Sequence, residues 1–243
     1  MRRRRSCIDP MTFSPDCRAC PRLAEFLDAG RVKHPDYYCK PVPAFGDLKL
    51  GDEQPGLLIV GLAPGFHGAN KTGRPFTGDH AGILLYETLH AFGYASRPVS
   101  MAADDGLQLL GCRITNAVKC VPPENKPETG EIARCNEYLK QELAGLPAGT
   151  AILALGRIAH SAVLRAFGLK EKDFVFGHDV RHALPGGRRL FNSYHCSRYN
   201  TQTRRLTPEM FRAVFTHIAA DSLAALPPCE SGVPLAGASY QQE

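Results

Sequence analysis

Four cysteines have the spacing of ligands for a metal ion or an iron–sulfur cluster. Cys17 and Cys20 form a CxxC pair, and a Pro-Pro turn and the start of an expected helix separate Cys120 from Cys135. Two such pairs can close on one tetrahedral zinc ion or on one [4Fe–4S] cluster, and the spacing does not choose between them. The simpler alternative is that all four are small buried hydrophobic side chains.

A glycine-rich segment, PGFHGANKTGRPFTGD at residues 64–79, has the composition of a binding loop. It contains four glycines and two prolines between two hydrophobic stretches. Glycines let the main chain lie very close to a bound molecule, at a cost in backbone entropy that a mere connection does not require. The segment therefore predicts a binding site, and it brings the polar residues Asn70 and Lys71 and the aromatic residue Phe76 to it.

Four strand-helix units are expected to position these residues. Short apolar runs predict strands at 57–64, 112–120, 151–156 and 188–195, and helical spacing of apolar residues predicts helices at 81–94, 129–146, 157–168 and 207–226. Strands that alternate with helices favour a parallel sheet covered on both faces. The expected fold class is α/β, a three-layer α/β/α sandwich with a central, mainly parallel, four-stranded sheet.

The loops after these strands are the expected site of function. Ligands of parallel sheets bind at the carboxyl ends of the strands, in the loops that lead into helices. Three of the four loops are long and polar. The side chains expected to converge on one cleft there are Asn70, Lys71, Arg74, Phe76, Asn116, His195 and Arg198.

Composition predicts a globular protein with a substantial core. Of 243 residues, 44% are hydrophobic. The formal net charge is +5, and without the four arginines at positions 2–5 it is 5 − 4 = +1. The overall charge therefore does not indicate whether the protein binds nucleic acid. The cysteines number nine, an odd count, and the basic start of the chain lacks the apolar run of a signal peptide. A disulfide framework is therefore not expected.

The domain organisation expected is one domain with two disordered ends. A disordered basic arm is expected over 1–16, the domain over 17–226, and a disordered tail over 227–243. No stretch has the length of apolar sequence that a membrane span needs. We therefore expect a monomeric cytoplasmic protein without a membrane partner.

Three motifs and the cysteine spacing together resemble one enzyme family. GLAPGFHGANKTGRPFTGD, TNAVKC followed by a cysteine fifteen positions later, and SYHCSRYNTQT occur in the order found in iron–sulfur uracil-DNA glycosylases of the type-5 branch, also called type b. The resemblance implies a uracil-DNA glycosylase-like fold and a [4Fe–4S] cluster on Cys17, Cys20, Cys120 and Cys135. It also implies excision of uracil and other deaminated bases from double-stranded DNA, with single-stranded DNA as a second expected substrate, which leaves an abasic site and starts base excision repair.

The chemistry of that reaction suits the candidate residues. Such an enzyme rotates the nucleotide out of the duplex, so the ring of Phe76 is expected to stack on the base. The amide of Asn116 can offer a donor and an acceptor to the base edge. His195 is expected to face the uracil O2 as negative charge builds on the leaving base. Without the family context, these could equally be a loop phenylalanine over the core, a capping asparagine and a histidine bonded to its own loop.

The turn after the first strand departs from other branches, which place an acidic or amide residue there. This chain has Gly-Leu-Ala-Pro, with Ala63 at that place. Water is therefore expected to be oriented by Asn70, by Asn116 or by main-chain carbonyls, or else the glycosidic bond dissociates well before water attacks, which is the route favoured here. Gly65 stands where some relatives have a bulky residue, so a roomier pocket and a wider substrate range are expected.

Basic and aromatic residues after the last strand predict contacts with the DNA backbone. Phosphate contacts, or a wedge that fills the gap left by the flipped base, are expected from Lys71, Arg198, Tyr199, Arg204 and Arg205. A solvated basic loop is the alternative. A non-catalytic zinc- or cluster-stapled nucleic-acid-binding module would share the cysteines and the basic loops, but it would not need the glycine-rich loop, Asn116 and His195 at one edge.

Overall fold

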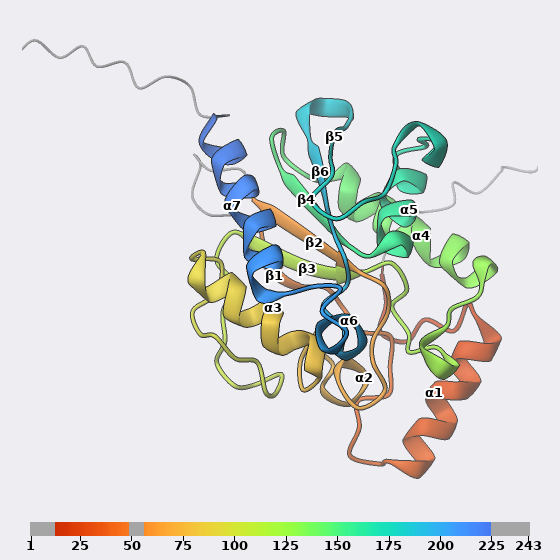
Figure 1. Cartoon of the computed structure of the whole chain (residues 1–243). Coiled ribbons are helices and arrows are strands. Elements are labelled where there is room, and N and C mark those ends of the chain that lie inside the picture. The colour runs from red at the N-terminus through yellow and green to blue at the C-terminus, as the bar shows by residue number, and fades with distance from the viewer. Residues whose placement is uncertain (1–12, 49–55, 225–243) are drawn as a thin grey trace, which may run out of the picture.

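A computed structural model describes residues 13–48 and 56–224, and within them the chain forms one six-stranded sheet (Figure 1). Its strands, in the order in which they lie side by side, are β1 (Phe45–Asp47), β3 (Cys112–Asn116), β2 (Leu57–Gly61), β4 (Ala151–Leu155), β6 (Arg189–Ser193) and β5 (Arg181–Ala183). The four central strands β3, β2, β4 and β6 are parallel, whereas β1 and β5 pair antiparallel at the two edges.

The helices lie on both faces of this sheet and at its carboxyl edge. They are α1 (Pro21–Lys33), α2 (Ala69–Thr72), α3 (His80–Ala91), α4 (Thr129–Ala144), α5 (Arg157–Ala166), α6 (Arg198–Gln202) and α7 (Pro208–Ala224). The described residues also form three short 3₁₀ turns in the connections between these elements, at Pro123–Asn125, Glu171–Asp173 and Pro185–Gly187. In Figure 1, α3 and α7 lie on one side of the sheet and α4 and α5 on the other.

The predicted three-layer α/β/α sandwich is confirmed, and the sheet is two strands wider than expected. The four parallel strands are the four that their buried apolar runs predicted. The edge strands escaped prediction because each is three residues long, and neither Phe-Gly-Asp nor Arg-His-Ala has an apolar run or clear alternation.

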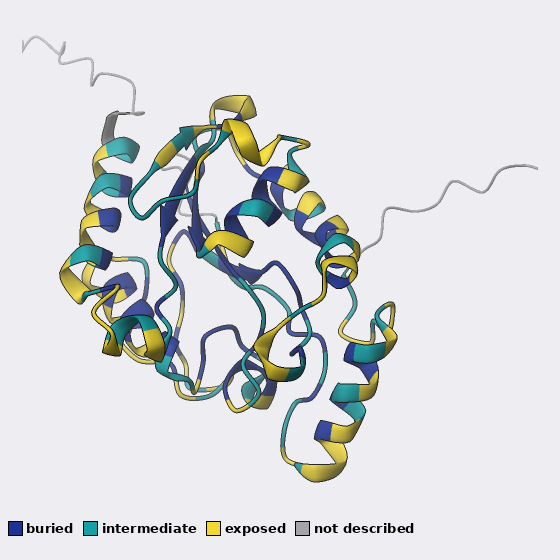
Figure 2. Ribbon diagram, turned by 45° about the vertical axis from the view of Figure 1, so that its right-hand side comes forward, coloured by how far each residue is buried: buried dark blue, intermediate teal, exposed yellow. Residues whose placement is uncertain are grey.

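Alternating side chains of the central strands build two separate cores. Leu57 and Ile59 of β2 face the layer of α3 and α7, where Phe211 and Phe215 of α7 pack, whereas Leu58 of β2 faces the layer of α4 and α5. All five residues of β2 and of β4 are buried, so both faces of these strands are covered (Figure 2). The sheet is therefore a rigid support for the loops at its carboxyl edge.

Local capping fixes where the helices at that edge begin. The carboxylate of Asp79 accepts a hydrogen bond from the backbone N–H of Gly82 at 2.9 Å and starts α3 directly after the glycine-rich loop. The hydroxyl of Thr207 accepts one from Met210 at 3.2 Å and starts α7. At the end of the strands, Gly61 of β2 pairs with Asn116 of β3, so the two loops that follow leave the sheet side by side.

The expectations for the ends of the chain fall largely outside the described residues. The arm expected over 1–16 overlaps them only at 13–16, and the tail expected over 227–243 lies entirely outside them. Among the helices that the structure describes, none has the length and apolar character that crossing a membrane requires.

Candidate active site and cysteine cluster

A cavity of about 360 Å³ opens where the loops after β2, β3 and β6 meet. The five residues predicted to contact a base all line it: Ala63, Gly65, Phe76, Asn116 and His195. They come from three separate segments of the chain, the loop after β2, the end of β3 and the loop after β6, and the parallel sheet brings them together as expected from their places at the ends of the strands.

Phe76 is held in an unusual backbone conformation at this cavity. Its φ of 54° lies in the left-handed region, which is strained for a residue with a bulky side chain. Two glycines make room for it, because a Cβ on Gly61 would come within 2.7 Å of the ring and a Cβ on Gly82 would collide with the carbonyl oxygen of Phe76. The hydroxyl of Tyr86 also donates to the carbonyl of Pro75 at 2.9 Å. The surroundings therefore fix the ring at one place on the cavity wall.

Asn116, the last residue of β3, presents an unsatisfied polar atom at the cavity. The residue is 2% exposed, and its Oδ1 has no hydrogen-bond partner among the described residues. A buried amide oxygen without a partner costs free energy, and such atoms in native structures call for a specific explanation. A ligand that offers an N–H group at this edge of the cavity would satisfy it.

His195 follows β6 and lies across from the phenylalanine ring. The two ring centroids are 5.9 Å apart, with planes inclined by 29°. Burial lowers the pKa of His195 from 6.5 to about 4, so its imidazole is neutral near pH 7. The amide of Asn200 donates to the main-chain carbonyl of His195 at 2.8 Å and ties the histidine to α6. A neutral imidazole has one ring N–H that can donate to a ligand.

Asp79 supplies a carboxylate that the sequence interpretation did not place here. It lines the cavity, and burial raises its pKa while hydrogen bonds from the first turn of α3 oppose the rise. Its side chain lies against Gly68, where a Cβ would come within 2.6 Å of the Asp79 Cβ. The available signal was an aspartate between a glycine-rich loop and a helical pattern, which marks an N-cap, and an N-cap at a strand's carboxyl edge faces the ligand.

Asn125 on the cavity rim was also missed. Glu124 and Asn125 both have positive φ, 54° and 57°, in the turn that follows the two prolines after β3. Two adjacent non-glycine residues in this region of backbone space are uncommon, and such strain clusters at functional sites. The Pro-Pro sequence predicted a turn but gave no indication of its direction.

The structure does not bring Asn70 or Arg74 to the cavity. Asn70 is 1% exposed, and its amide donates to the carbonyl of Phe66 at 3.4 Å and toward Cys39 Sγ at 3.5 Å. Arg74 is buried in an ion pair with Asp105 at 2.7 Å. Both side chains therefore hold the glycine-rich loop in place: Asn70 bonds to Phe66 in the same loop, and Arg74 bonds to Asp105 in a neighbouring one.

The residues predicted to contact phosphate lie on the surface near the cavity, in two groups. Arg198 and Tyr199 begin α6 and are exposed, and Arg204 and Arg205 follow it, with Arg205 4.6 Å from the centroid of the Tyr194 ring. Lys71 is exposed on α2, 5.4 Å from the centroid of the Tyr37 ring. Arg198, Tyr199, Arg204 and Arg205 therefore form one surface group on and just after α6, and Lys71 on α2 belongs to another.

The four predicted cysteine ligands gather at one place beside α1 and α4. Cys17, Cys20, Cys120 and Cys135 line a single small cavity. Burial raises the pKa of Cys120, and the three other thiols raise it further, so the sulfur atoms are close enough to influence one another. No set of three or more ligating side chains in the described residues has the spacing for a single metal ion. A cubane cluster differs, because it places one iron at each corner and needs thiolates farther apart.

Hydrogen-bond donors surround these sulfur atoms. The hydroxyl of Tyr138 donates to Cys17 Sγ at 3.3 Å and the backbone N–H of Lys119 to Cys135 Sγ at 3.2 Å. The guanidinium of Arg134 lies 3.6 Å from Cys20 Sγ. Donors aimed at sulfur stabilise a thiolate over a thiol, so the donor set suits sulfur atoms that bind metal.

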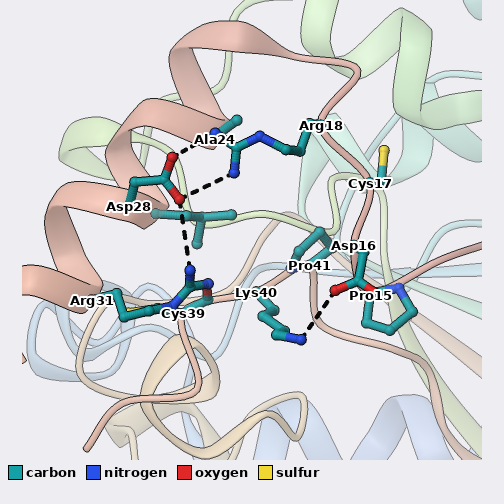
Figure 3. Close-up of a pocket in the computed structure, with 11 residues that line it drawn as sticks. Pro15, Asp16, Cys17, Arg18, Ala24, Asp28, Arg31, Cys39, Lys40 and Pro41 are labelled. Atoms are coloured by element: carbon teal, nitrogen blue, oxygen red, sulfur yellow. Dashed lines mark hydrogen bonds and ion pairs between the residues drawn. The ribbon is translucent and has the colours of Figure 1, made fainter. Parts of the chain in front are cut away.

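Ion pairs join the CxxC turn to α1, through Arg18 and Asp28, and to the segment at residue 40, through Asp16 and Lys40 (Figure 3). Arg18 and Arg31 both point toward Asp28, with Arg18 Nη1 3.1 Å from the carboxylate, and Lys40 reaches Asp16 at 3.0 Å. These pairs are exposed, and each contributes little on its own. Together they line a cavity of about 200 Å³ next to Cys17 and hold the turn against the rest of the domain.

Comparison with known proteins identifies the family. The sequence model described as the uracil DNA glycosylase superfamily matches residues 48–219. The chain belongs to that superfamily. A type-5 uracil-DNA glycosylase of Thermus thermophilus is 47% identical over 203 residues, which cover 82% of this chain and 90% of that protein. One of Mycobacterium leprae is 44% identical over 207 residues, 82% and 88% of the two chains.

Similarity to another branch of the superfamily is weaker and shorter. A type-4 uracil-DNA glycosylase of Pyrobaculum aerophilum is 37% identical over 133 residues, 54% of this chain and 57% of that protein, whereas a type-5 enzyme of the same organism is 38% identical over 211 residues, 85% and 89%. The predicted membership of the superfamily, and the resemblance to its type-5 branch, are thus confirmed. The cavity described above lies within the matched residues.

Proposed function

We propose that this chain is a type-5 uracil-DNA glycosylase, which flips uracil out of DNA and hydrolyses its N-glycosidic bond to leave an abasic site. The observation that supports this most is the joint placement of the Phe76 ring, the unsatisfied Asn116 amide and the neutral His195 imidazole on one cavity. A flat stacking surface, a hydrogen-bonding edge and a donor are what excision of a planar base requires.

The base stacks on Phe76 and pairs with Asn116. A fixed aromatic ring binds any flat base without regard to sequence. The free Oδ1 of Asn116 accepts the N3–H of uracil, and its amide N–H₂ group donates to a carbonyl oxygen of the same edge. Cytosine has no N–H at N3, so pairing at this position favours uracil and other deaminated bases.

His195 stabilises the leaving base. As the glycosidic bond lengthens, negative charge develops on the uracil ring, including O2. The neutral imidazole donates its ring N–H to this oxygen, and because the site is buried the hydrogen bond strengthens as the charge grows. A donor of this kind accelerates a reaction by about 10²–10³-fold.

Asp79 orients the attacking water. The turn after β2 has Ala63 where other branches place a polar residue, and the carboxylate at the start of α3 reaches the same cavity from another side. Burial raises its pKa, which makes it a stronger base than an exposed aspartate. Asn70 was one of the groups expected from the sequence to orient water, but its amide is turned away from the cavity. We therefore assign this role to Asp79, in place of the route favoured from the sequence, in which the glycosidic bond dissociates well before water attacks.

The small residues of the cavity favour a wide range of bases. Ala63 and Gly65 line it, and within the described part of the chain the only atom within 4 Å of a Cβ placed on Gly65 is Asp79 Oδ2, at 3.6 Å. The space beside Gly65 is therefore open enough for a ring larger than uracil, such as hypoxanthine.

The DNA lies across the surface formed by α6 and the residues after it. Arg198, Tyr199, Arg204 and Arg205 provide cations and one exposed ring there, and Lys71 extends the contact along the glycine-rich loop. Backbone contacts of this type bind both double-stranded and single-stranded DNA and weaken steeply with salt.

A [4Fe–4S] cluster on Cys17, Cys20, Cys120 and Cys135 completes the enzyme. The four sulfur atoms line one cavity, and the donors from Tyr138, Arg134 and Lys119 suit thiolate ligands. When bound, the cluster supplies four strong bonds that crosslink the CxxC turn, the loop after β3 and α4. The loop with the strained residues Glu124 and Asn125 lies between two of these ligands, so the chain itself ties the cluster to the rim of the cavity.

The test is excision from a set of duplexes that each contain one uracil, hypoxanthine or thymine opposite guanine or adenine. Alkali cleaves the abasic sites, and the products are counted on a denaturing gel. The wild-type protein should cleave uracil duplexes and leave thymine opposite adenine intact. A protein that binds these duplexes without releasing any base would be a non-catalytic DNA-binding module, and the proposal would be wrong.

A further inference from the structure

A second and larger cavity adjoins the base cavity. It is a groove of about 560 Å³ between the glycine-rich loop, the start of α3 and the loop that contains Val99 and Met101. Its volume lies within the range of sites that bind small molecules or parts of larger ones. Of the five residues assigned to base contact, only Gly65 also lines this groove.

The groove and the base cavity share part of their walls. Gly65, Asp79 and Asn125 line both of them. A chain bound with one unit in the base cavity therefore continues directly into the groove. For a DNA strand, that unit is the flipped nucleotide, and the next unit is its neighbour in the same strand.

The groove has an exposed apolar rim. Met101 is 71% exposed, Ile83 is 55% exposed and Val99 is 52% exposed, and all three line the groove. Single exposed apolar residues are ordinary, but three that converge on one cavity next to a binding site indicate a ligand with an apolar surface. A nucleobase or the carbon face of a deoxyribose has such a surface.

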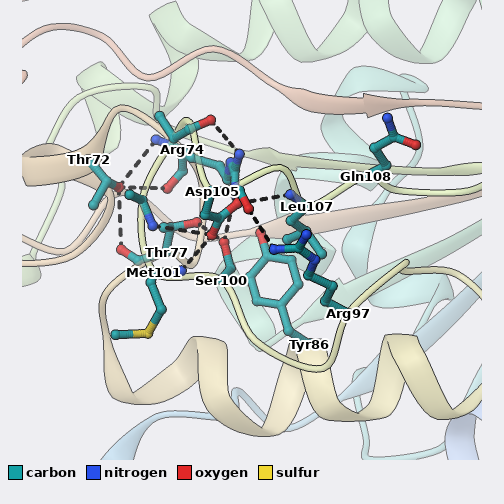
Figure 4. Close-up of polar contacts among 12 residues, drawn as sticks. Thr72, Arg74, Thr77, Tyr86, Arg97, Ser100, Met101, Asp105, Leu107 and Gln108 are labelled. Atoms are coloured by element: carbon teal, nitrogen blue, oxygen red, sulfur yellow. Dashed lines mark hydrogen bonds and ion pairs between the residues drawn. The ribbon is translucent and has the colours of Figure 1, made fainter.

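A polar network around the buried side chain of Arg74 fixes the loop that carries part of this rim (Figure 4). Arg74 donates to Asp105 at 2.7 Å and to Ser100 at 3.1 Å, and it also bonds the carbonyl of Ala103. Asp105 in turn accepts from the backbone N–H of Met101 at 2.8 Å. Burial alone would raise the pKa of Asp105, but these donors hold it well below its ordinary value, so the carboxylate stays ionised. The loop is therefore preformed for binding.

Charge on the groove is compatible with a nucleic-acid strand. Arg198 lines it and brings a guanidinium from α6, and His80 connects α3 to α6 through a 3.0 Å hydrogen bond with Thr201. The carboxylate of Asp79 lies on the wall shared with the base cavity. A phosphate can therefore meet Arg198 while the apolar part of the nucleotide meets the rim.

We propose that this groove is a second nucleotide subsite. It binds the nucleotide next to the flipped one in the same strand, with its base or sugar against Ile83, Val99 and Met101 and its phosphate near Arg198. The inference rests on the proposed function, because the flipped nucleotide defines the neighbour. It makes affinity depend on whether a base is present beside the lesion.

The test combines a change in the groove with a change in the DNA. The triple variant Ile83→Gln, Val99→Ser, Met101→Ser removes the apolar rim. Ile158→Gln with Val175→Ser is the matched control, since both residues are exposed and line neither cavity. Fluorescence anisotropy measures binding to duplexes with a tetrahydrofuran abasic unit at the lesion, and with either a nucleotide or a second abasic unit on its 5′ or 3′ side.

The wild-type and control proteins should lose affinity about tenfold when the neighbouring base is removed on one side only, which is the scale of one base contact. The triple variant should bind the duplex that has the neighbouring base about tenfold more weakly than the wild type does. Removal of that base should lower the affinity of the variant by less than a further twofold. The proposed subsite is wrong if the triple variant binds the duplex as tightly as the wild type does. It is also wrong if removal of the neighbouring base lowers the affinity of the variant as much as that of the wild type.

Uracil excision by the same wild-type preparation separates the two proposals. If the wild type excises uracil and the triple variant binds DNA as the wild type does, the subsite is contradicted and the proposed function is not. If the wild type does not excise uracil, the proposed function is contradicted, and the measured affinities still decide whether the groove contacts a neighbouring base.

Discussion

The ring of Phe76 lies directly against Gly61, at a distance that no side chain on residue 61 would permit. A Cβ there would come within 2.7 Å of the ring Cζ and would also meet Oδ1 of Asn116. The Phe76 ring and the Asn116 amide thus both lie directly against the backbone of the last residue of β2. The hydrophobic strand and the glycine at its end are the reason that both groups reach the cavity together.

Gly61→Ala should therefore reduce uracil excision about 100-fold, because displacing reacting groups by about 1 Å has an effect of this size. Single-turnover kinetics measures it. Gly130→Ala is the control, since a Cβ at Gly130 meets no atom of the described residues within 4 Å, and it should excise at the native rate. Native excision by Gly61→Ala would mean that Phe76 and Asn116 are not placed as described.

The pH dependence follows from two shifted pKa values. Burial lowers the pKa of His195 to about 4, so the neutral form is fully populated between pH 6 and 8, whereas burial raises the pKa of Asp79. The single-turnover rate should be level from pH 6 to 8 and should fall below that range, as Asp79 and His195 become protonated. A rate that rises about tenfold from pH 8 to pH 6 would instead identify a charged imidazole as the active form.

The lowered pKa of His195 also affects the stability of the fold. An unfolded chain binds a proton on His195 near pH 6.5, whereas the folded chain does not do so until about pH 4. The contribution of the buried neutral imidazole to the free energy of unfolding is therefore complete above pH 6.5 and is lost as pH falls toward 4. An NMR titration of the His195 ring checks the folded value directly.

Asp79→Asn separates the carboxylate's chemistry from its structural role. Asparagine caps helices about as well as aspartate, so α3 and the melting temperature should change little. The single-turnover rate should fall about 100-fold, which is the contribution of a general base. An unchanged rate at unchanged stability would show that Asp79 only begins the helix and that water attack does not depend on it.

Much of this site could be predicted from the sequence because it follows from strand ends. The four apolar runs at 57–64, 112–120, 151–156 and 188–195 predicted parallel strands, and their carboxyl ends placed Phe76, Asn116 and His195 on one edge. The edge strands β1 and β5 could not be predicted, since three residues are too few to show a period.

The direction of side chains within the loops was the part that could not be predicted. Asn70 and Asp79 both belong to the glycine-rich loop, but the turn of α2 directs Asn70 into the protein, and the first turn of α3 fixes Asp79 at the cavity. Arg74 was expected at the cleft and instead forms a buried ion pair with Asp105, a partner 31 positions away that no local pattern indicates.

If the four cysteines hold a cluster, loss of a cysteine ligand and loss of a hydrogen bond to that ligand should have different effects. Cys17→Ser should lower the iron content and the soluble yield, because three thiolates hold a cluster poorly. Tyr138→Phe keeps the ring that packs edge-on against Phe13 at 5.7 Å but removes the hydrogen bond to Cys17, so iron should remain while the visible spectrum of the cluster changes. Cys39→Ala is the control and should retain iron. Equal iron in Cys17→Ser and Cys39→Ala contradicts the ligand set.

The most direct test of the account is single-turnover excision by His195→Ala on a duplex with one uracil, with DNA binding measured in parallel. Stabilisation of the leaving base by His195 predicts a rate about 10²–10³-fold below that of the wild type, with affinity for the duplex nearly unchanged. A rate close to the wild type, while Asn116→Ala or Asp79→Asn abolishes excision, would contradict it and assign catalysis to the positioning of the base or of water instead.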